Sequence, residues 1–459
     1  MSRATMKSSL PGFALFLLAV AAPALAWATG HGSGEGMPAV AGIRLEFLFF
    51  GLTLLGVAVF HHHTLRVALT GLTVIVSYKL IFDPHFHLFE HFFGANGYLE
   101  QIVNKHARQG EWTILLNLFG LLVGFAVLAK HFEESRVPEW LPKYLPDDWK
   151  GPLVLLFFVF VLSTFLDNIA AAMIGGTIAL VVFNKRVHIG YIAAIVAASN
   201  AGGAGSVVGD TTTTMMWIDG VSALHVLPAF IGSASALLAF AFFAAIQQDR
   251  LQRIQKNETL DVRIDFGRLL IVVLMLAGTI VTNILFDFPA LGVWLGILLG
   301  AAFRKTPWHE ARHALGGSVF LLSLVTCASM MPVEELPAAS WHSAFTLGFV
   351  SSVFDNIPLT KLALDQGCYD WGMLAYAVGF GGSMIWFGSS AGVAISNIFE
   401  EAKSVVSWLR RGWFVTVAYV IGFFVMLLVW GWHPEDTGQI KVKDCAAAHG
   451  EVQGESGAR

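Results

Sequence analysis

Two copies of an Asp-Asn pair lie inside long apolar runs of this sequence. Asp167-Asn168 lies midway along residues 152–183, and Asp355-Asn356 lies within residues 341–364. An unpaired carboxylate at membrane depth costs roughly 2.5–3.5 kcal/mol on insertion scales, so such a residue usually serves a function. Because the motif occurs twice, we interpret the two pairs as parts of one functional site.

A glycine-rich interruption appears in the apolar run that follows each Asp-Asn pair. In the first, Gly202-Gly203 precedes Gly209-Asp210-Thr211; in the second, Gly381-Gly382 precedes Gly388-Ser389-Ser390 at the same spacing. Glycines at this density break a helix and free its terminal carbonyl and amide groups. The matching interruptions and the paired Asp-Asn motifs predict two homologous halves.

The side chains at these four breaks predict a site for a small hard cation. Carboxylate, amide, hydroxyl and free carbonyl oxygens are the ligands that such cations prefer, and they offer little to soft transition metals. Burial favours the protonated form of a carboxylate, so the same acid can hold a proton at one stage and Na⁺ at another. The predicted ion-binding and proton-exchange residues are Asp167, Asn168, Asn200, Asp210, Thr211, Asp355, Asn356, Ser389 and Ser390.

An anion site is the opposite interpretation, because helix N-termini at the breaks favour negative ligands. The aspartates at the two bends and Asp210 would repel a carboxylate substrate unless they were protonated or paired with a cation. We therefore favour cation/proton antiport. A Na⁺-coupled symporter of citrate, a dicarboxylate or another anion remains the alternative, with the same acids holding the coupling ion. A membrane scaffold or receptor has no need of buried acids in both halves.

The composition places these motifs in an integral membrane protein. The 459 residues are 56% hydrophobic and 13% charged, against about 25% charged in a soluble protein. Lysine and arginine fall in short clusters between apolar runs, which argues against nucleic-acid binding. The sequence contains no P-loop, so no motif in it indicates ATP hydrolysis. Neither His61-His62-His63 nor the group His85, His87 and His91 has strong metal-ligand spacing. We expect a transporter without a resident metal or cofactor, and not an enzyme.

Charges at the ends of the apolar runs predict how the two halves are oriented. Residues 152–183 are flanked by Lys150 and by Lys185-Arg186, so both ends of this run are expected on the cytoplasmic side. Residues 341–364 are flanked by acidic residues, so both ends are expected outside. Each run therefore predicts a re-entrant hairpin bent at its Asp-Asn pair, and non-helical backbone at that depth is tolerated where it lines a cavity.

The predicted fold is an all-α polytopic membrane protein of two inverted repeats, with about ten full crossings and two hairpins. The first repeat is 43–246, with hairpin 152–183 and broken helix 189–217; the second is 268–432, with hairpin 341–364 and broken helix 372–398. A cytoplasmic linker, 247–267, joins them. Residues 1–26 have the features of a signal peptide, and residues 433–459 form a polar tail. Both mature termini are expected outside the cytoplasm.

With these motifs the sequence resembles the NhaD-type sodium/proton antiporters, from about Ile43 to Trp432. That family belongs to the ion transporter superfamily, which also includes arsenite permeases and citrate or dicarboxylate carriers. The resemblance implies exchange of Na⁺ or Li⁺ for H⁺ across a bacterial inner membrane. It also implies elevator-like motion of the hairpins and broken helices in the bilayer, commonly in a homodimer.

Lys361 lies about one turn beyond the second Asp-Asn pair. We consider it a charge partner for Asp355 or Asp210 that replaces a bound cation and changes the charge moved per cycle. Alternatively, the lysine extends its ammonium group to the membrane interface.

Overall fold

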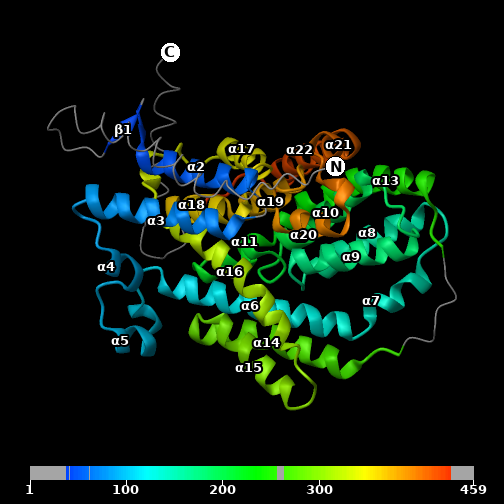
Figure 1. The fold of residues 1–459 in the computed structure, drawn as a ribbon, viewed down its shortest axis with the longest axis horizontal. Helices are drawn as coiled ribbons and strands as arrows, with labels where there is room; N and C mark the ends of the chain where they lie inside the picture. Colours follow the sequence, from blue (N-terminus) through cyan, green and yellow to red (C-terminus); the bar gives the residue numbers. More distant parts are fainter. Residues whose placement is uncertain (1–37, 41, 61–62, 256–262, 436–459) are drawn as a thin grey trace, which may run out of the picture. The chain divides into compact units, whose positions relative to one another are not determined.

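The computed structural model describes residues 38–40, 42–60, 63–255 and 263–435 (Figure 1). The regular secondary structure of these residues is helical, apart from strands β1 (Ala39–Val40) and β2 (Ile43–Arg44), which pair antiparallel. The prediction of an all-α chain is confirmed. The predicted signal peptide, 1–26, and nearly all of the predicted tail, 433–459, lie outside the described residues.

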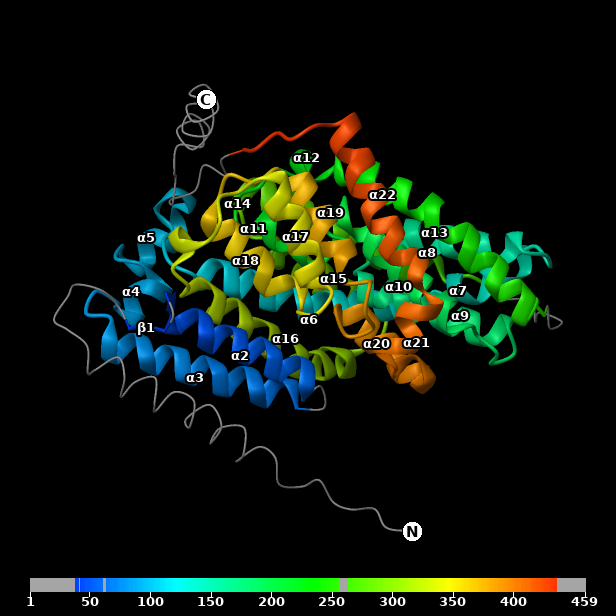
Figure 2. The same cartoon turned by 90° about the horizontal axis from the view of Figure 1, so that it is seen from above.

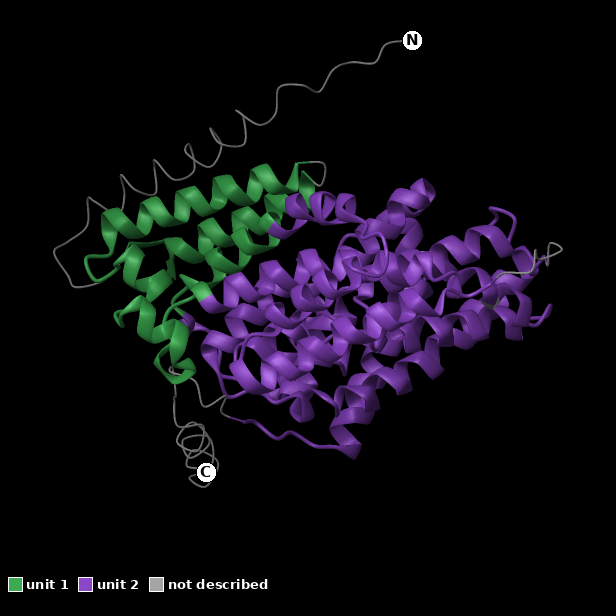
Figure 3. Ribbon diagram, turned by 90° about the horizontal axis from the view of Figure 1, so that it is seen from below, with its two compact units in different colours: residues 1–112, 319–332 green, residues 113–318, 333–459 purple. Residues whose placement is uncertain are grey.

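One compact unit is formed by described residues up to Trp112 and by Val319–Pro332 (Figure 3). In it, α2 packs against α3. Glu46 is buried at the start of α2, and its carboxylate contacts Arg44 and, at 3.4 Å, the Lys79 ammonium. This unit includes α2 (Leu45–Val59), α3 (Thr64–Phe82), α4 (Leu88–Phe93), α5 (Tyr98–Val103) and the 3-10 turn η1 (Lys105–Ala107).

The other unit is formed by Thr113–Ser318 and Val333–Arg459 and holds every predicted site residue. Two of its helices, α6 and α16, also include residues that belong to the first unit. Its first elements are α6 (Trp112–Glu134), α7 (Val137–Trp140), η2 (Leu141–Tyr144), α8 (Lys150–Ser163), α9 (Asn168–Val182), α10 (Ile189–Ala204), α11 (Thr211–Ile218), α12 (Ala223–Val226), α13 (Ala229–Leu251), α14 (Phe266–Phe286), α15 (Pro289–Ala301) and α16 (Trp308–Ser329). Its last elements are η3 (Val333–Glu335), α17 (Trp341–Ser351), α18 (Asn356–Gln366), α19 (Trp371–Gly381), α20 (Ser390–Ile398), η4 (Glu400–Lys403), α21 (Val405–Arg411) and α22 (Trp413–Val429).

The core of this unit is built on α10 and α19, which pack against each other and are buried at every position. Helix α10 also contacts α8, α9 and α13, and α19 contacts α17, α18 and α22. The sequence explains the burial, because both helices consist of small and apolar residues around the entire circumference. Polar side chains near the ends of these helices are therefore enclosed by protein.

The short helices that follow the two glycine-rich breaks each pack against a helix of the other half. Helix α11, which follows α10, packs against α18, and α20, which follows α19, packs against α9 (Figure 2). Each hairpin arm that begins at an Asp-Asn pair thus contacts the second part of the broken helix from the opposite half.

Five helical segments among the described residues have the length and apolar composition needed to cross a membrane. The bent pair α21 and α22, with an angle of 62° between its helices, makes a sixth if it is one span. Helices α2, α8, α9, α10 and α15 are apolar but shorter, at 10–17 residues. The helices are those of an integral membrane protein, and the count of about ten crossings stays a prediction.

Asp265 holds the N-terminus of α14, outside the apolar part of that helix. Its Oδ1 accepts hydrogen bonds from the backbone N–H groups of Gly267 and Arg268, and the Arg304 guanidinium lies 3.4 Å away. The hydrogen bond from Arg304 lowers the pKa of the Asp265 carboxyl below its ordinary value. Stability from this shift is therefore present above the unfolded-state pKa and is lost as pH falls through the folded-state pKa.

Two substitutions at Asp265 are expected to separate the helix cap from the ion pair. Asp265→Asn keeps a capping oxygen and loses only an exposed ion pair, so it should lower the free energy of unfolding by less than about 1 kcal/mol. Asp265→Ala also removes the cap and should cost about 1 kcal/mol more. Thermal unfolding of the purified protein at neutral pH measures both, and equal melting temperatures for the two variants would contradict this assignment.

Candidate functional site

The two Asp-Asn pairs lie at breaks between short helices. Helix α8 ends at Ser163 and α9 begins at Asn168, while α17 ends at Ser351 and α18 begins at Asn356. Asp167 caps α9 by accepting a hydrogen bond from the Ile169 backbone N–H at 3.2 Å, and Asp355 caps α18 in the same way through Ile357 at 3.1 Å. Aspartate is among the best N-cap residues, which explains why both helices begin where they do.

The residues after the glycine-rich breaks are also N-caps. Asp210 Oδ1 accepts a hydrogen bond from the Thr212 N–H at 2.9 Å and starts α11, and Ser389 Oγ accepts one from the Gly392 N–H at 3.2 Å and starts α20. Capping alone thus accounts for one oxygen of each aspartate. A functional role has to be argued from the remaining oxygens.

The remaining oxygens of Asp167 and Asp355 join each hairpin to the broken helix of its own half. Thr211 donates its hydroxyl to Asp167 Oδ1 at 3.4 Å, and Ser390 donates its hydroxyl to Asp355 Oδ2 at 3.2 Å. In both halves the donor is the first residue of the helix after the break. The structure therefore brings together the predicted residues of each hairpin with those of its neighbouring break.

Asn200 links the two halves at the centre of the unit. Its Oδ1 accepts a hydrogen bond from Asn168 Nδ2 at 3.1 Å, and its own Nδ2 donates to Ser383 Oγ at 2.9 Å and to Ser389 Oγ at 3.1 Å. Asn168, Ser383 and Ser389 are also buried. Ser383 was not among the predicted site residues, although its place directly after Gly381-Gly382 is a signal that the sequence contains.

Close approach of the backbones explains the glycines around the site. A Cβ atom at Gly202 would collide with the carbonyl oxygen of Phe160, and one at Gly381 would collide with that of Gly348. At Gly209 the obstacle would be the Ser163 carbonyl oxygen. Because these positions carry no side chain, the broken helices lie directly against the hairpins.

The carboxylates differ in their exposure and in their partners. Asp167 and Asp355 are partly exposed, whereas Asp210 is 1% exposed and its Oδ2 has no hydrogen-bond partner. Among the described residues the three carboxylates do not converge on one point as three ligands of a single metal would. Asp210 is therefore the most enclosed of the three acids and the one with a carboxylate oxygen that accepts no hydrogen bond.

Two further predicted residues lie on α18. Asn356 is buried at the first position of the helix. Lys361 is 1% exposed, and its ammonium lies 2.9 Å from the carboxylate of Asp365, one turn further along. The lysine is thus enclosed in an ion pair with an acid of its own helix. Its predicted pairing with Asp355 or Asp210 stays a prediction.

The threonines after Asp210 divide between two roles. Thr213 and Thr214 donate their hydroxyls to backbone carbonyl oxygens of Ser206, Val207 and Asp210, at distances from 2.5 to 2.9 Å. They satisfy carbonyl groups that the helix break leaves free, as expected for hydroxyls next to an interruption. Thr211 instead donates its hydroxyl to the Asp167 carboxylate, and its role as an ion ligand stays a prediction.

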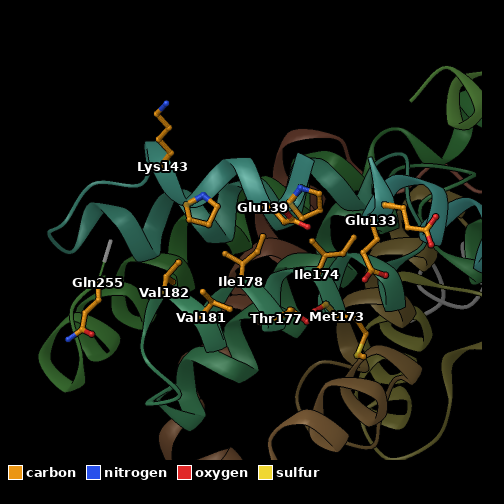
Figure 4. A pocket seen from close by; sticks show the side chains of 13 residues that line it. Glu133, Glu139, Lys143, Met173, Ile174, Thr177, Ile178, Val181, Val182 and Gln255 are labelled. Carbon is orange, nitrogen blue, oxygen red and sulfur yellow. Dashed lines mark hydrogen bonds between the residues drawn. The ribbon is translucent and has the colours of Figure 1, made fainter. Parts of the chain in front are cut away.

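A cavity of about 610 Å³ lies elsewhere, between α9 and the segment from the end of α6 to η2 (Figure 4). On α9 the cavity is lined by Met173, Ile174, Thr177, Ile178, Val181 and Val182. None of the predicted ion ligands lines it, and the glycine face of α9 that packs on Val159 and Ile395 is a different one. The cavity is therefore separate from the candidate site.

Replacement of Asn200 by alanine is expected to weaken folding. The change leaves the Asn168 amide and the Ser383 hydroxyl buried without this partner, at a cost of about 1–3 kcal/mol for each unsatisfied group. Ser199→Ala is the matched control, because Ser199 is equally buried but donates only to the Val196 carbonyl of its own helix. Thermal unfolding would be measured for both, and equal losses of stability would refute a linking role for Asn200.

Curated proteins that are similar to this chain are mostly described as ion antiporters. A "Sodium/proton antiporter 1" of Arabidopsis thaliana is 27% identical over 61% of this chain and 56% of its own length. The "Na(+)/H(+) antiporter NhaD" of Vibrio cholerae is 23% identical over 60% of this chain and 69% of its own. The "Sodium/proton antiporter 2" of Arabidopsis thaliana is 27% identical over 71% of this chain and 87% of its own. The match thus covers little more than half of the first of these relatives.

A family model extends this similarity across most of the sequence. The model described as "Citrate transporter" (CitMHS) matches residues 6–381, which include both hairpins, the first broken helix and the first part of the second. The match includes Asp167, Asp210 and Asp355, the three acids of the candidate site. The chain is a member of the citrate transporter family, CitMHS.

Proposed function

We propose that this protein is a secondary transporter that exchanges Na⁺ or Li⁺ for H⁺ across a bacterial inner membrane. The observation that carries the proposal is the Asp210 carboxylate, which is buried at a helix break with one oxygen unpaired. A buried carboxylate is stable only when it is protonated, paired or bound to a cation. The similarity to proteins described as sodium/proton antiporters supports the same assignment.

Competition for the acids supplies the exchange mechanism. When a proton neutralises Asp210 the Na⁺ site is lost, and when Na⁺ binds the proton must leave. An empty, charged site is costly to move through a low-dielectric barrier, so the protein changes conformation with one cation or the other bound. The hydroxyl oxygens of Thr211 and Ser390 lie next to Asp167 and Asp355, and together with Ser389 they replace part of the hydration shell of the cation.

Two inverted repeats give this mechanism its geometry. The hydrogen bonds from Thr211 to Asp167 and from Ser390 to Asp355 are related in sequence position between the halves. The contacts of α11 with α18 and of α20 with α9 are reciprocal as well. Inverted repeats whose broken helices meet near the middle of the bilayer are a recurring arrangement in secondary transporters.

Proton flux in inverted membrane vesicles tests the proposal. A preset pH gradient should collapse when NaCl or LiCl is added to vesicles that contain the protein, and should persist in vesicles without it. If neither salt dissipates the gradient while citrate accumulates together with Na⁺, antiport is wrong and the Na⁺-coupled symporter takes its place. The family description, "Citrate transporter", is the reason to include that substrate.

A further inference from the structure

The two oxygens of Asp210 have different surroundings. Oδ1 accepts the capping hydrogen bond from Thr212, while Oδ2 is buried and accepts none. A carboxylate oxygen without a donor in a buried position is costly, and a proton or a cation beside it removes the cost. The space next to Oδ2 is therefore the place where the identity of the bound cation matters most.

Two of the smallest residues, Gly379 and Ala204, lie at that space. A Cβ atom at Gly379 of α19 would lie 3.2 Å from Asp210 Oδ2 and 3.5 Å from the Cβ of Ala204, the last residue of α10. Gly379 lies inside a helix with an ordinary φ, so its backbone does not require glycine. Glycine inside a helix is destabilising by roughly 0.5–1 kcal/mol relative to alanine. What glycine provides at this position is therefore the volume that a side chain would otherwise fill.

We propose that Gly379 and Ala204 set the size of the cation that Asp210 binds, and thereby the selectivity among Li⁺, Na⁺ and K⁺. This inference rests on the proposed exchange function. Selectivity between cations of equal chemistry depends on the room available and on the number of oxygen ligands. Neither side chain offers a ligand, so both act as positioning residues through the volume beside Oδ2.

Two reciprocal substitutions test this role. Gly379→Ala places a methyl group beside Oδ2 and should favour the smaller Li⁺, whereas Ala204→Gly enlarges the space and should favour Na⁺ and K⁺. KM values for LiCl, NaCl and KCl would be measured as salt-dependent collapse of a pH gradient in proteoliposomes. The ratio of the Na⁺ KM to the Li⁺ KM should rise about tenfold in Gly379→Ala, the discrimination that one methyl group commonly gives, and fall in Ala204→Gly.

Gly372→Ala is the matched control. It lies on the same helix, and its added methyl group would contact the His225 carbonyl and Pro228, at 3.0 and 3.2 Å, away from Asp210. Thermal unfolding of each variant reports any loss of packing, and a purely structural effect would lower the maximal rate for all ions without changing the KM ratio. If the wild type exchanges Na⁺ but neither variant shifts the ratio, the selectivity role is wrong and the function stands. If the wild type exchanges no cation, the function itself is refuted, and this inference with it.

Discussion

Substitution of Asp210 by asparagine is expected to reduce Na⁺- and Li⁺-dependent proton flux to the level of vesicles that lack the protein. Asparagine has the shape of aspartate but cannot be protonated in the same way and carries no charge to bind a cation. Its side-chain oxygen can still accept the hydrogen bond from Thr212, and the two residues are about equal as N-caps. Folding should therefore be preserved while exchange is lost.

A second aspartate provides the control for this result. Asp148 precedes α8, is about half exposed and lies 3.9 Å from Lys150 in a pair that solvent screens. Asp148→Asn should exchange Na⁺ at the wild-type rate. Expression in the membrane and thermal unfolding would be compared for all three proteins, and wild-type flux in Asp210→Asn would remove Asp210 from the transport site.

Alanine at Gly202 is expected to be the most destabilising of the single-methyl changes considered. Its Cβ would collide with the Phe160 carbonyl oxygen, where α10 lies against α8, and a backbone atom cannot rotate away as a side chain can. Overpacking of this kind commonly costs about 1–3 kcal/mol and occasionally more. Gly381→Ala should behave alike, because the Gly348 carbonyl oxygen obstructs it in the same manner.

Gly316 supplies the contrast for these two glycines. It lies inside α16, is exposed and has nothing within 4 Å of an added Cβ. Alanine there should leave stability unchanged or raise it by up to about 1 kcal/mol, since alanine favours helices more than glycine does. Thermal unfolding in detergent ranks the variants. A melting temperature for Gly202→Ala as high as that of Gly316→Ala would contradict the packing described.

The sequence was most informative where polar residues and glycines interrupt apolar runs. An aspartate in an apolar run has a high cost, so Asp167, Asp210 and Asp355 could be selected from their positions alone. Their N-cap roles follow from residue preference. Helix ends at Ser163 and Ser351 are likewise consistent with bends at the Asp-Asn pairs, because both helices stop a few residues before them.

Other features depend on contacts that local sequence does not encode. The hydrogen bonds from Asn200 to Ser383 and Ser389 join residues more than 180 positions apart, so only the fold can identify them. The proximity of Gly379 to Asp210 likewise depends on the fold and not on local sequence. The Lys361–Asp365 pair is different, since acid and base four residues apart on a helix are a local signal. Asp365 therefore competes with Asp355 and Asp210 as the partner of Lys361.

The central claim is that a cation and a proton move in opposite directions through one site. Uptake of ²²Na⁺ into proteoliposomes under an imposed pH gradient, with no citrate or other organic anion present, tests it directly. An acidic interior should drive ²²Na⁺ inward, reversal of the gradient should drive it outward, and Asp210→Asn should do neither. Uptake of ²²Na⁺ that requires citrate and ignores the direction of the pH gradient would contradict the account.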